Sequence, residues 1–145
     1  MCQTSLVNAG RDKEHAAFKL TTKTSNALIN MTFTASPARH SLHWEASTSN
    51  GPVHATLDGA YQGDIYLATS PYTPPFVRIN ENARDPEHMG RQRVVRLDHA
   101  ANLHRPGTVE GTVRWGSDSE GDKEKGGAKG SVEITTSNAS ITLVV

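Results

Sequence analysis

The chain has 145 residues, which is close to the commonest size for one domain and too short for two comfortable hydrophobic cores. Fifteen Lys and Arg residues balance fifteen Asp and Glu residues, so the formal net charge is zero. The broad electrostatic attraction on which non-specific nucleic-acid binding depends is therefore absent, and we expect one domain that does not bind nucleic acid.

The first fifteen residues are polar and lack the apolar core of a signal peptide. We expect residues 1–15 to have no fixed structure and residues 16–145 to form a single domain. Cys2 is the only cysteine, which excludes an internal disulfide and suits a reducing compartment. No later run approaches the ~18 consecutive apolar residues that a membrane helix needs. The sequence thus predicts a soluble protein without a membrane partner, cytoplasmic if the chain is complete.

Short stretches in which apolar and polar residues alternate follow one another from residue 29 onward, and this period of two is typical of half-buried strands. In the first stretch Ile29, Met31 and Phe33 share one face. Thr and Val are abundant, and both pack well on a pleated surface. The alternation predicts about nine strands, around residues 29–33, 42–46, 53–57, 65–67, 77–79, 95–97, 109–115, 132–134 and 141–145.

A Thr-Ser-Asn tripeptide recurs at residues 24–26, 48–50 and 136–138, each time between two predicted strands. A degenerate fourth copy at residues 69–71 spaces the corners of the first half roughly 20 to 24 residues apart, as in the rungs of β-solenoids. Asn tolerates left-handed backbone angles and Ser and Thr bond nearby backbone groups, so the tripeptide suits a tight corner. We favour this interpretation over an exposed polar ladder that binds a ligand. The expected fold is all-β, either a solenoid-like β-roll or a two-sheet β-sandwich.

Two segments interrupt the alternation. Residues 81–93 contain Asp-Pro-Glu and predict a long loop. Residues 117–130 mix Gly, Lys, Asp and Glu, with Ala128 as the only apolar residue, and predict an inserted loop. At the end of the first loop, Arg91, Arg93 and Arg96 flank an apolar centre and predict a strand with arginines at its polar edges rather than a nucleic-acid site.

Three stretches resemble a fungal domain of unknown function that is described as adhesin-like: residues 48–57, residues 61–70, and residues 113–116 with the Thr-Ser-Asn that follows them. The resemblance covers roughly residues 18–145 and extends in layout to bacterial adhesin-type β-roll domains. It implies a β-roll and an adhesive role, and no catalytic residue, because the shared motifs are those of turns and strands. The chain departs from the pattern at Ala27 and Ala139, where we expect looser corners.

No group of residues forms a motif for catalysis or metal binding. His40 and His43 are three residues apart, so on a strand they point to opposite faces. With His54 they are expected to be solvated side chains on a sheet face rather than a zinc or copper site. Asp98 and His99 lack the strained nucleophile turn of a hydrolase. We predict no catalytic residue, no metal and no cofactor.

Aromatic residues are the remaining candidates for a site. Trp44 and Trp115 share the inward phase of their strands and are expected in the core. Tyr61, Tyr66 and Tyr72 are the predicted ligand-binding residues. Tyr66 is out of phase with its apolar neighbours, and Tyr72 lies just before two consecutive prolines where a shallow groove would form.

The function favoured by the sequence is a non-enzymatic binding or structural module, adhesin-like by resemblance, that contacts carbohydrate or another protein. One alternative is a small carbohydrate-active hydrolase, which needs two carboxylates about 5 to 9.5 Å apart across a cleft. Fifteen scattered acidic residues provide no preferred pair. The other alternative is a homo-oligomeric scaffold, because an exposed strand at residues 141–145 would offer an unpaired edge to another chain.

Overall fold

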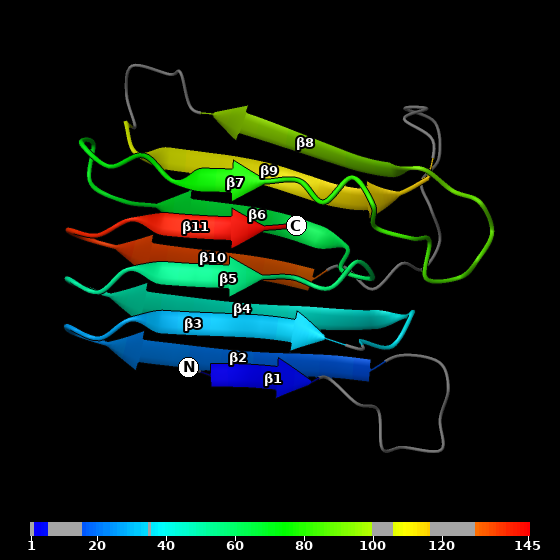
Figure 1. Ribbon diagram of the computed structural model, residues 1–145, viewed down its shortest axis with the longest axis horizontal. Helices are drawn as coiled ribbons and strands as arrows, with labels where there is room; N and C mark the ends of the chain where they lie inside the picture. Colours follow the sequence, from blue (N-terminus) through cyan, green and yellow to red (C-terminus); the bar gives the residue numbers. More distant parts are fainter. Residues whose placement is uncertain (1, 6–15, 35, 100–105, 117–129) are drawn as a thin grey trace.

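The computed structural model describes residues 2–5, 16–34, 36–99, 106–116 and 130–145 (Figure 1). Over these residues the protein is all-β, as the sequence predicts, with eleven strands in two packed sheets that do not close into a barrel. The described part of the chain has no helix that could cross a membrane. The strands are β1 (Cys2–Ser5), β2 (Ala16–Thr24), β3 (Ile29–Thr34), β4 (His40–Thr48), β5 (Val53–Thr56), β6 (Gly63–Ala68), β7 (Phe76–Arg78), β8 (Arg93–His99), β9 (Thr108–Trp115), β10 (Gly130–Thr136) and β11 (Ile141–Val144).

From β1 to β8 the chain changes sheet at each connection, so consecutive strands face each other across the core instead of pairing. Sheet A has the order β1-β3-β5-β11-β7 and sheet B the order β2-β4-β10-β6-β9-β8. Pairing is parallel throughout sheet A. In sheet B it is parallel among the neighbouring strands β2, β4, β10 and β6, whereas β9 is antiparallel to both β6 and β8. Each strand–corner–strand unit is therefore one rung of an open two-sheet roll.

The last rung lies in the middle of the roll (Figure 1). β10 pairs with β4 on one side and β6 on the other, while β11 pairs with β5 and β7. The prediction that residues 141–145 form an exposed edge is wrong, because β11 has a neighbour on both sides and Leu143 and Val145 are fully buried. Among the described residues the sheet edges belong to β1 and β7 in sheet A and to β2 and β8 in sheet B.

The Thr-Ser-Asn copies form corners, as predicted, and the corners stack on one another. In each copy the Thr Oγ1 accepts a hydrogen bond from the backbone N–H three residues later, at 3.4, 3.1 and 3.3 Å for the first, second and third copies. Asn50 Nδ2 donates to Asn26 Oδ1 at 2.7 Å, and Asn138 Nδ2 donates to Asn50 Oδ1 at 2.8 Å. The repeat is thus a structural ladder, and the corners at Ala27 and Ala139 make the same capping bond as the corner at Gly51.

Gly51 occupies the middle corner of this ladder, and its lack of a side chain is required there. A Cβ at this position would overlap the carbonyl oxygen of Ala27 on the neighbouring corner. The corner is also held by the N–H groups of Ser49 and Asn50, which both donate to the carbonyl of Ser25. Close stacking of this corner on the first therefore explains why the middle copy carries glycine.

The core lies between the sheets and is filled by the inward residues of each strand. Trp44 and Trp115 are both buried, which confirms the prediction from strand phase. Trp44 packs edge-on against Phe33, with ring centroids 5.2 Å apart, and its Nε1 donates to Thr22 Oγ1 at 3.2 Å. Trp115 Nε1 donates to the carbonyl of Gly59 at 3.0 Å. Both indole N–H groups thus have partners, as buried tryptophans require.

The nine predicted strands correspond to β3–β11, and the sequence pattern missed β1 and β2. β2 is an edge strand whose apolar residues Phe18 and Leu20 are only half-buried and alternate with Lys and Thr, so its apolar signal is weak. β1 lies within the N-terminal segment for which no fixed structure was expected. Residues 6–15, and residues 117–129 of the second predicted loop, lie outside the described residues.

Candidate functional site

Tyr61, the first of the three predicted ligand-binding tyrosines, lies in the core and not on the surface. Its side chain is 1% exposed, its ring packs close to Gly130, and its hydroxyl donates to the carbonyl of Asp64 at 2.7 Å. Burial, and then the nearby charge of Asp64, raise the pKa of Tyr61 well above its ordinary value. The prediction failed because Tyr61, in the connection between β5 and β6, packs its ring into the core near Gly130.

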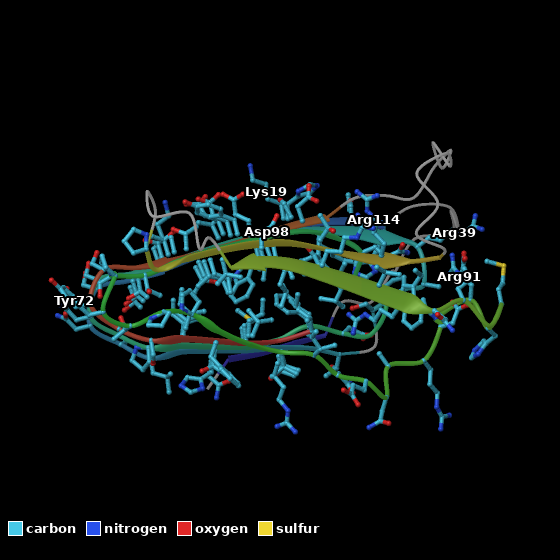
Figure 2. All side chains as sticks on the ribbon, turned by 90° about the horizontal axis from the view of Figure 1, so that it is seen from above. Lys19, Arg39, Tyr72, Arg91, Asp98 and Arg114 are labelled. Carbon is cyan, nitrogen blue, oxygen red and sulfur yellow. The ribbon has the colours of Figure 1, made fainter. Side chains whose placement is uncertain are left out.

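The other two tyrosines are accessible but lie on different parts of the molecule. Tyr72 is 93% exposed in the connection between β6 and β7 and projects from one end of the roll (Figure 2). Tyr66 is half-buried and alternates with the buried Ile65 and Leu67, so it lies on the outer face of sheet B. The structure therefore does not gather the three tyrosines into one surface.

The register of the strands places a carboxylate on each side of Tyr66. Its partner on β10 is Glu133 and its partner on β9 is Glu110. The row continues through Glu45 on β4 and Asp98 on β8, and all four acidic side chains are exposed. Because neighbouring strands are about 4.8 Å apart, the row places an aromatic ring between two carboxylates on the outer face of sheet B. The sequence did not predict this row, since its members come from strands far apart along the chain.

The three histidines considered as metal ligands lie apart. His40 is buried at the start of β4, in phase with Leu42, and its Nδ1 lies 2.7 Å from the carbonyl of Pro37. The expectation that it is solvated is wrong, because its strand phase points inward. His43 is exposed on sheet B and His54 on sheet A. No cluster of three metal-ligating side chains occurs within the described residues.

A cleft of about 420 Å³ opens at one end of the roll, where the β3–β4 and β5–β6 connections meet the long connection between β7 and β8. Its walls combine small apolar residues with a similar number of polar and charged ones, and it is open to solvent. The lining residues are Ser36, Ala38, Asp58, Gly59, Ala60, Asn80, Ala83, Arg84, Asp85, Pro86 and His88.

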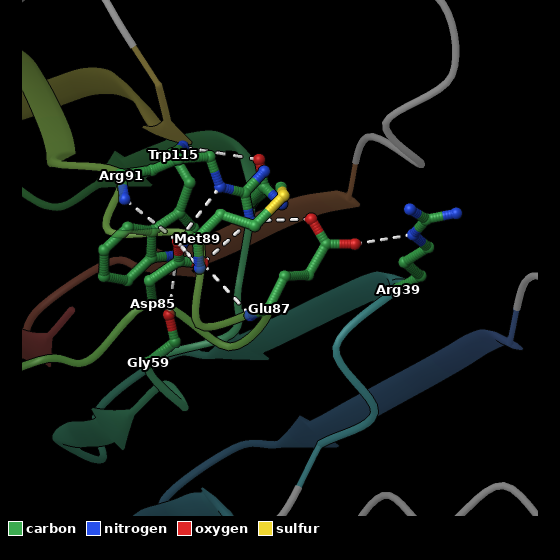
Figure 3. A network of polar contacts seen from close by, with 8 residues as sticks. Arg39, Gly59, Asp85, Glu87, Met89, Arg91 and Trp115 are labelled. Atoms are coloured by element: carbon green, nitrogen blue, oxygen red, sulfur yellow. Dashed lines mark hydrogen bonds and ion pairs between the residues drawn. The ribbon is translucent and has the colours of Figure 1, made fainter.

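One wall of the cleft is fixed by the carboxylate of Asp85, whose side chain is 7% exposed (Figure 3). It accepts the backbone N–H groups of Glu87, Met89 and Arg91, each at 3.0 Å. The Arg91 guanidinium adds contacts from Nε at 3.2 Å and from Nη2 at 2.9 Å. These bonds, above all those from Arg91, hold the pKa of Asp85 well below its usual range, so this carboxyl stays ionised. We call residues 85–91 the Asp85 loop.

The Asp85 loop is tied to the opposite wall by Glu87. Glu87 Oε1 accepts from Arg39 Nε at 2.6 Å, and Glu87 Oε2 lies 2.9 Å from Arg91 Nη2. Arg39 belongs to the β3–β4 connection, so both sides of the cleft are connected (Figure 3). Within the loop, His88 has a φ of 54°, a left-handed conformation that costs free energy in a residue other than glycine. Such strain is concentrated at functional sites.

Asp58 holds the β3–β4 and β5–β6 connections together at the cleft. Its Oδ2 accepts the N–H of Ser36 at 2.8 Å, and its Oδ1 accepts the N–H of Ala60 at 2.9 Å. The nearby positive charge of Arg93 interacts with Asp58. Because a carboxylate can accept about four hydrogen bonds, Asp58 keeps accepting capacity beyond these two backbone contacts.

Arg93 was expected at the polar edge of a strand, and this prediction is wrong. It is in phase with Val95 and Leu97, which pack against the core. Its guanidinium carbon lies 5.8 Å from the centre of the Trp115 ring, and its three nitrogen atoms are buried with no hydrogen-bond partner among the described residues. Burial lowers the pKa of Arg93, and the charge of Asp58 opposes this effect. The period-two phase places Arg93 inward, but the residues near it, Trp115 and Asp58, come from distant parts of the chain and are not visible in that pattern.

Two carboxylates, Asp58 and Asp85, line the cleft, which is the arrangement that a glycoside hydrolase would need. Asp85 is unsuited to act as a general acid, however. Its oxygens already accept several hydrogen bonds, and its pKa is lowered, whereas a catalytic acid needs a raised pKa. Asp85 therefore could not donate the proton that glycoside hydrolysis requires.

No known family profile, no curated protein and no solved structure matches the chain. The resemblance to a fungal adhesin-like domain thus stays a hypothesis.

Proposed function

We propose that the protein is a non-enzymatic carbohydrate-binding module with an adhesin-like role, and that the outer face of sheet B is its contact surface. The observation that carries this proposal is the position of Tyr66 between Glu110 and Glu133 on an exposed, regularly paired face. A tyrosine ring offers an apolar face with a polar tip, which suits the C–H face of a sugar ring. The flanking carboxylates can accept hydrogen bonds from sugar hydroxyls, and charged acceptors make the stronger bonds.

The arrangement of the sheet suits an extended ligand better than a compact one. Residues of the same row recur on each strand at a spacing of about 4.8 Å, so the face is repetitive. Next to the Tyr66 row, register aligns His43, Ser131, Asp64 and Thr112, which add further hydrogen-bonding groups. A polysaccharide chain lying across the strands would meet such groups along its length.

The proposal is tested by incubating the purified protein with insoluble chitin, β-glucan and cellulose, and by assaying the supernatants for released reducing sugar. We expect retention on at least one polymer without release of sugar. Tyr66→Ala should reduce retention about tenfold, the equivalent of one strong contact. Tyr72→Ala, which removes an equally large but distant aromatic ring, is the matched control and should be retained like the wild type.

Retention that is lost with Tyr72→Ala and kept with Tyr66→Ala would move the site to the end of the roll. Release of reducing sugar would overturn the non-enzymatic assignment. Absence of retention on all three polymers would overturn the carbohydrate assignment.

A further inference from the structure

The cleft beside the Asp85 loop is preformed. Its two walls are joined by the contact of Arg39 with Glu87, and Asp58 fixes two connections at once. The backbone around the cleft is therefore already ordered, and the conformational entropy lost on binding is mainly that of the exposed side chains that contact the ligand. The cleft shares no residue with the Tyr66 row.

Several polar groups at the cleft are not used by the fold. The side chains of Arg84 and His88 are exposed and make no hydrogen bond or ion pair with the rest of the described structure. Asn80 uses its Oδ1 to accept the N–H of Asn82 at 3.1 Å, which leaves its Nδ2 as a donor. With the spare acceptor capacity of Asp58, the cleft offers both donors and acceptors.

The charges at the cleft restrict the kind of ligand. Asp58 and Asp85 each have an arginine nearby, Arg93 and Arg91 respectively, and Arg84 adds a positive charge to the lining. An ion of either sign therefore meets both attraction and repulsion at the cleft, and a neutral ligand avoids the repulsion. Hydroxyl groups both donate and accept, so a neutral polyol satisfies Arg84 and Asp58 together.

We propose that this cleft is a second binding site, for a neutral hydroxyl-rich ligand of the size of one or two sugar rings, either a free sugar or the end of a glycan chain. Arg84, His88 and Asn80 donate to the ligand hydroxyls, Asp58 accepts from them, and the alanine side chains contact the ring carbons. The cleft residues are separate from those of sheet B, so an experiment can disprove binding at one of the two sites without affecting the other.

The test is ligand-detected NMR and calorimetric titration of the full chain with glucose, galactose, mannose and N-acetylglucosamine. Inorganic phosphate and glycine serve as the anionic and zwitterionic probes. We expect saturable binding of at least one sugar at an affinity of about 1 mM, which is typical of a few hydrogen bonds. Arg84→Gln should weaken this binding about tenfold, whereas Arg114→Gln, an exposed arginine on β9, should leave it unchanged (Figure 2).

Two further variants separate binding from folding and from the other site. His88→Gly removes the imidazole while it relieves the left-handed backbone, so it should keep or raise the melting temperature and still weaken sugar binding. Tyr66→Ala reports the sheet B site, and the sugar binding that Arg84→Gln weakens should persist in it. If a disaccharide binds more tightly than the single sugars and its binding also depends on Arg84, the ligand is the end of a glycan chain. If the disaccharide and the single sugars bind with equal affinity, the ligand is a free sugar.

The proposal is overturned if no sugar binds, if only phosphate or glycine binds, or if Arg84→Gln and His88→Gly bind the sugars as tightly as the wild type does.

Discussion

Asp85 shows at the scale of one residue how a polar side chain organises an irregular segment. The connection from β7 to β8 has no regular secondary structure, yet one carboxylate gathers three backbone N–H groups and an arginine within it. Loops of this length in compact domains are commonly functional. The ionised state of Asp85 is what makes the arrangement stable, since a carboxylate accepts hydrogen bonds more strongly than a neutral group does.

Replacing Asp85 by Asn should therefore make stability less dependent on pH. The pKa of Asp85 in the folded protein lies below the unfolded value of 3.8, so its contribution is fully present above about pH 4 and is lost as the pH falls further. We expect Asp85→Asn to melt at a lower temperature than the wild type at neutral pH, and the difference to shrink below about pH 4. Thermal melts across this range measure it. A difference that stays constant with pH would contradict the assignment, and Asp98→Asn, on an exposed carboxyl, is the control.

At the scale of the element, the Thr-Ser-Asn corner is a repeated unit whose copies support one another. Each corner is capped by its own threonine, and the asparagine amides connect neighbouring corners. The sequence predicted the corners because Thr, Ser and Asn act on their immediate neighbours. It did not predict that the third copy stacks on the second, because those copies are separated by most of the chain.

The middle corner should tolerate substitution least. Gly51→Ala places a Cβ on the carbonyl oxygen of Ala27, and neither backbone segment can move without breaking the bonds from Ser49 and Asn50. We expect the free energy of unfolding to fall by more than about 2 kcal/mol, as for other overpacked sites. Urea denaturation measures it. Ala139→Gly, the converse change in an outer corner, should cost at most about 1 kcal/mol, and equal losses for the two variants would refute the steric explanation.

At the scale of the whole molecule, the C-terminal rung joins two parts of the roll that precede it in sequence. β10 and β11 lie between the rung of β4 and β5 and the rung of β6 and β7, which do not pair with each other directly. The buried residues of this rung include Val132, Ile134, Ile141 and Leu143. The central contacts of the fold are thus long-range, and they form only after the last strand is available.

Deleting residues 141–145 should consequently abolish cooperative unfolding, because it removes fully buried side chains and leaves β5 and β7 without their shared neighbour. Circular dichroism during heating measures the transition. Deletion of residues 1–5 is the control, since β1 is an edge strand that pairs only with β3. A cooperative transition in the C-terminal deletion would show that β11 is dispensable.

The sequence by itself determined nine of the eleven described strands and where the Thr-Ser-Asn corners lie. Alternation such as that of Ile29, Met31 and Phe33 and the Thr-Ser-Asn chemistry depend only on neighbouring residues, so both are visible in one dimension. The burial of Trp44 and Trp115 follows from the same phase rule.

Tertiary structure alone decided the order of the rungs and the composition of both candidate sites. The row of Tyr66, Glu110 and Glu133, the inward position of Arg93 and the cleft at Asp58 all join residues from distant strands or connections. β10 and β11 pair with strands that lie far before them in the chain, so proximity along the chain does not determine their partners. The residues that meet at a surface therefore have no fixed spacing in the sequence.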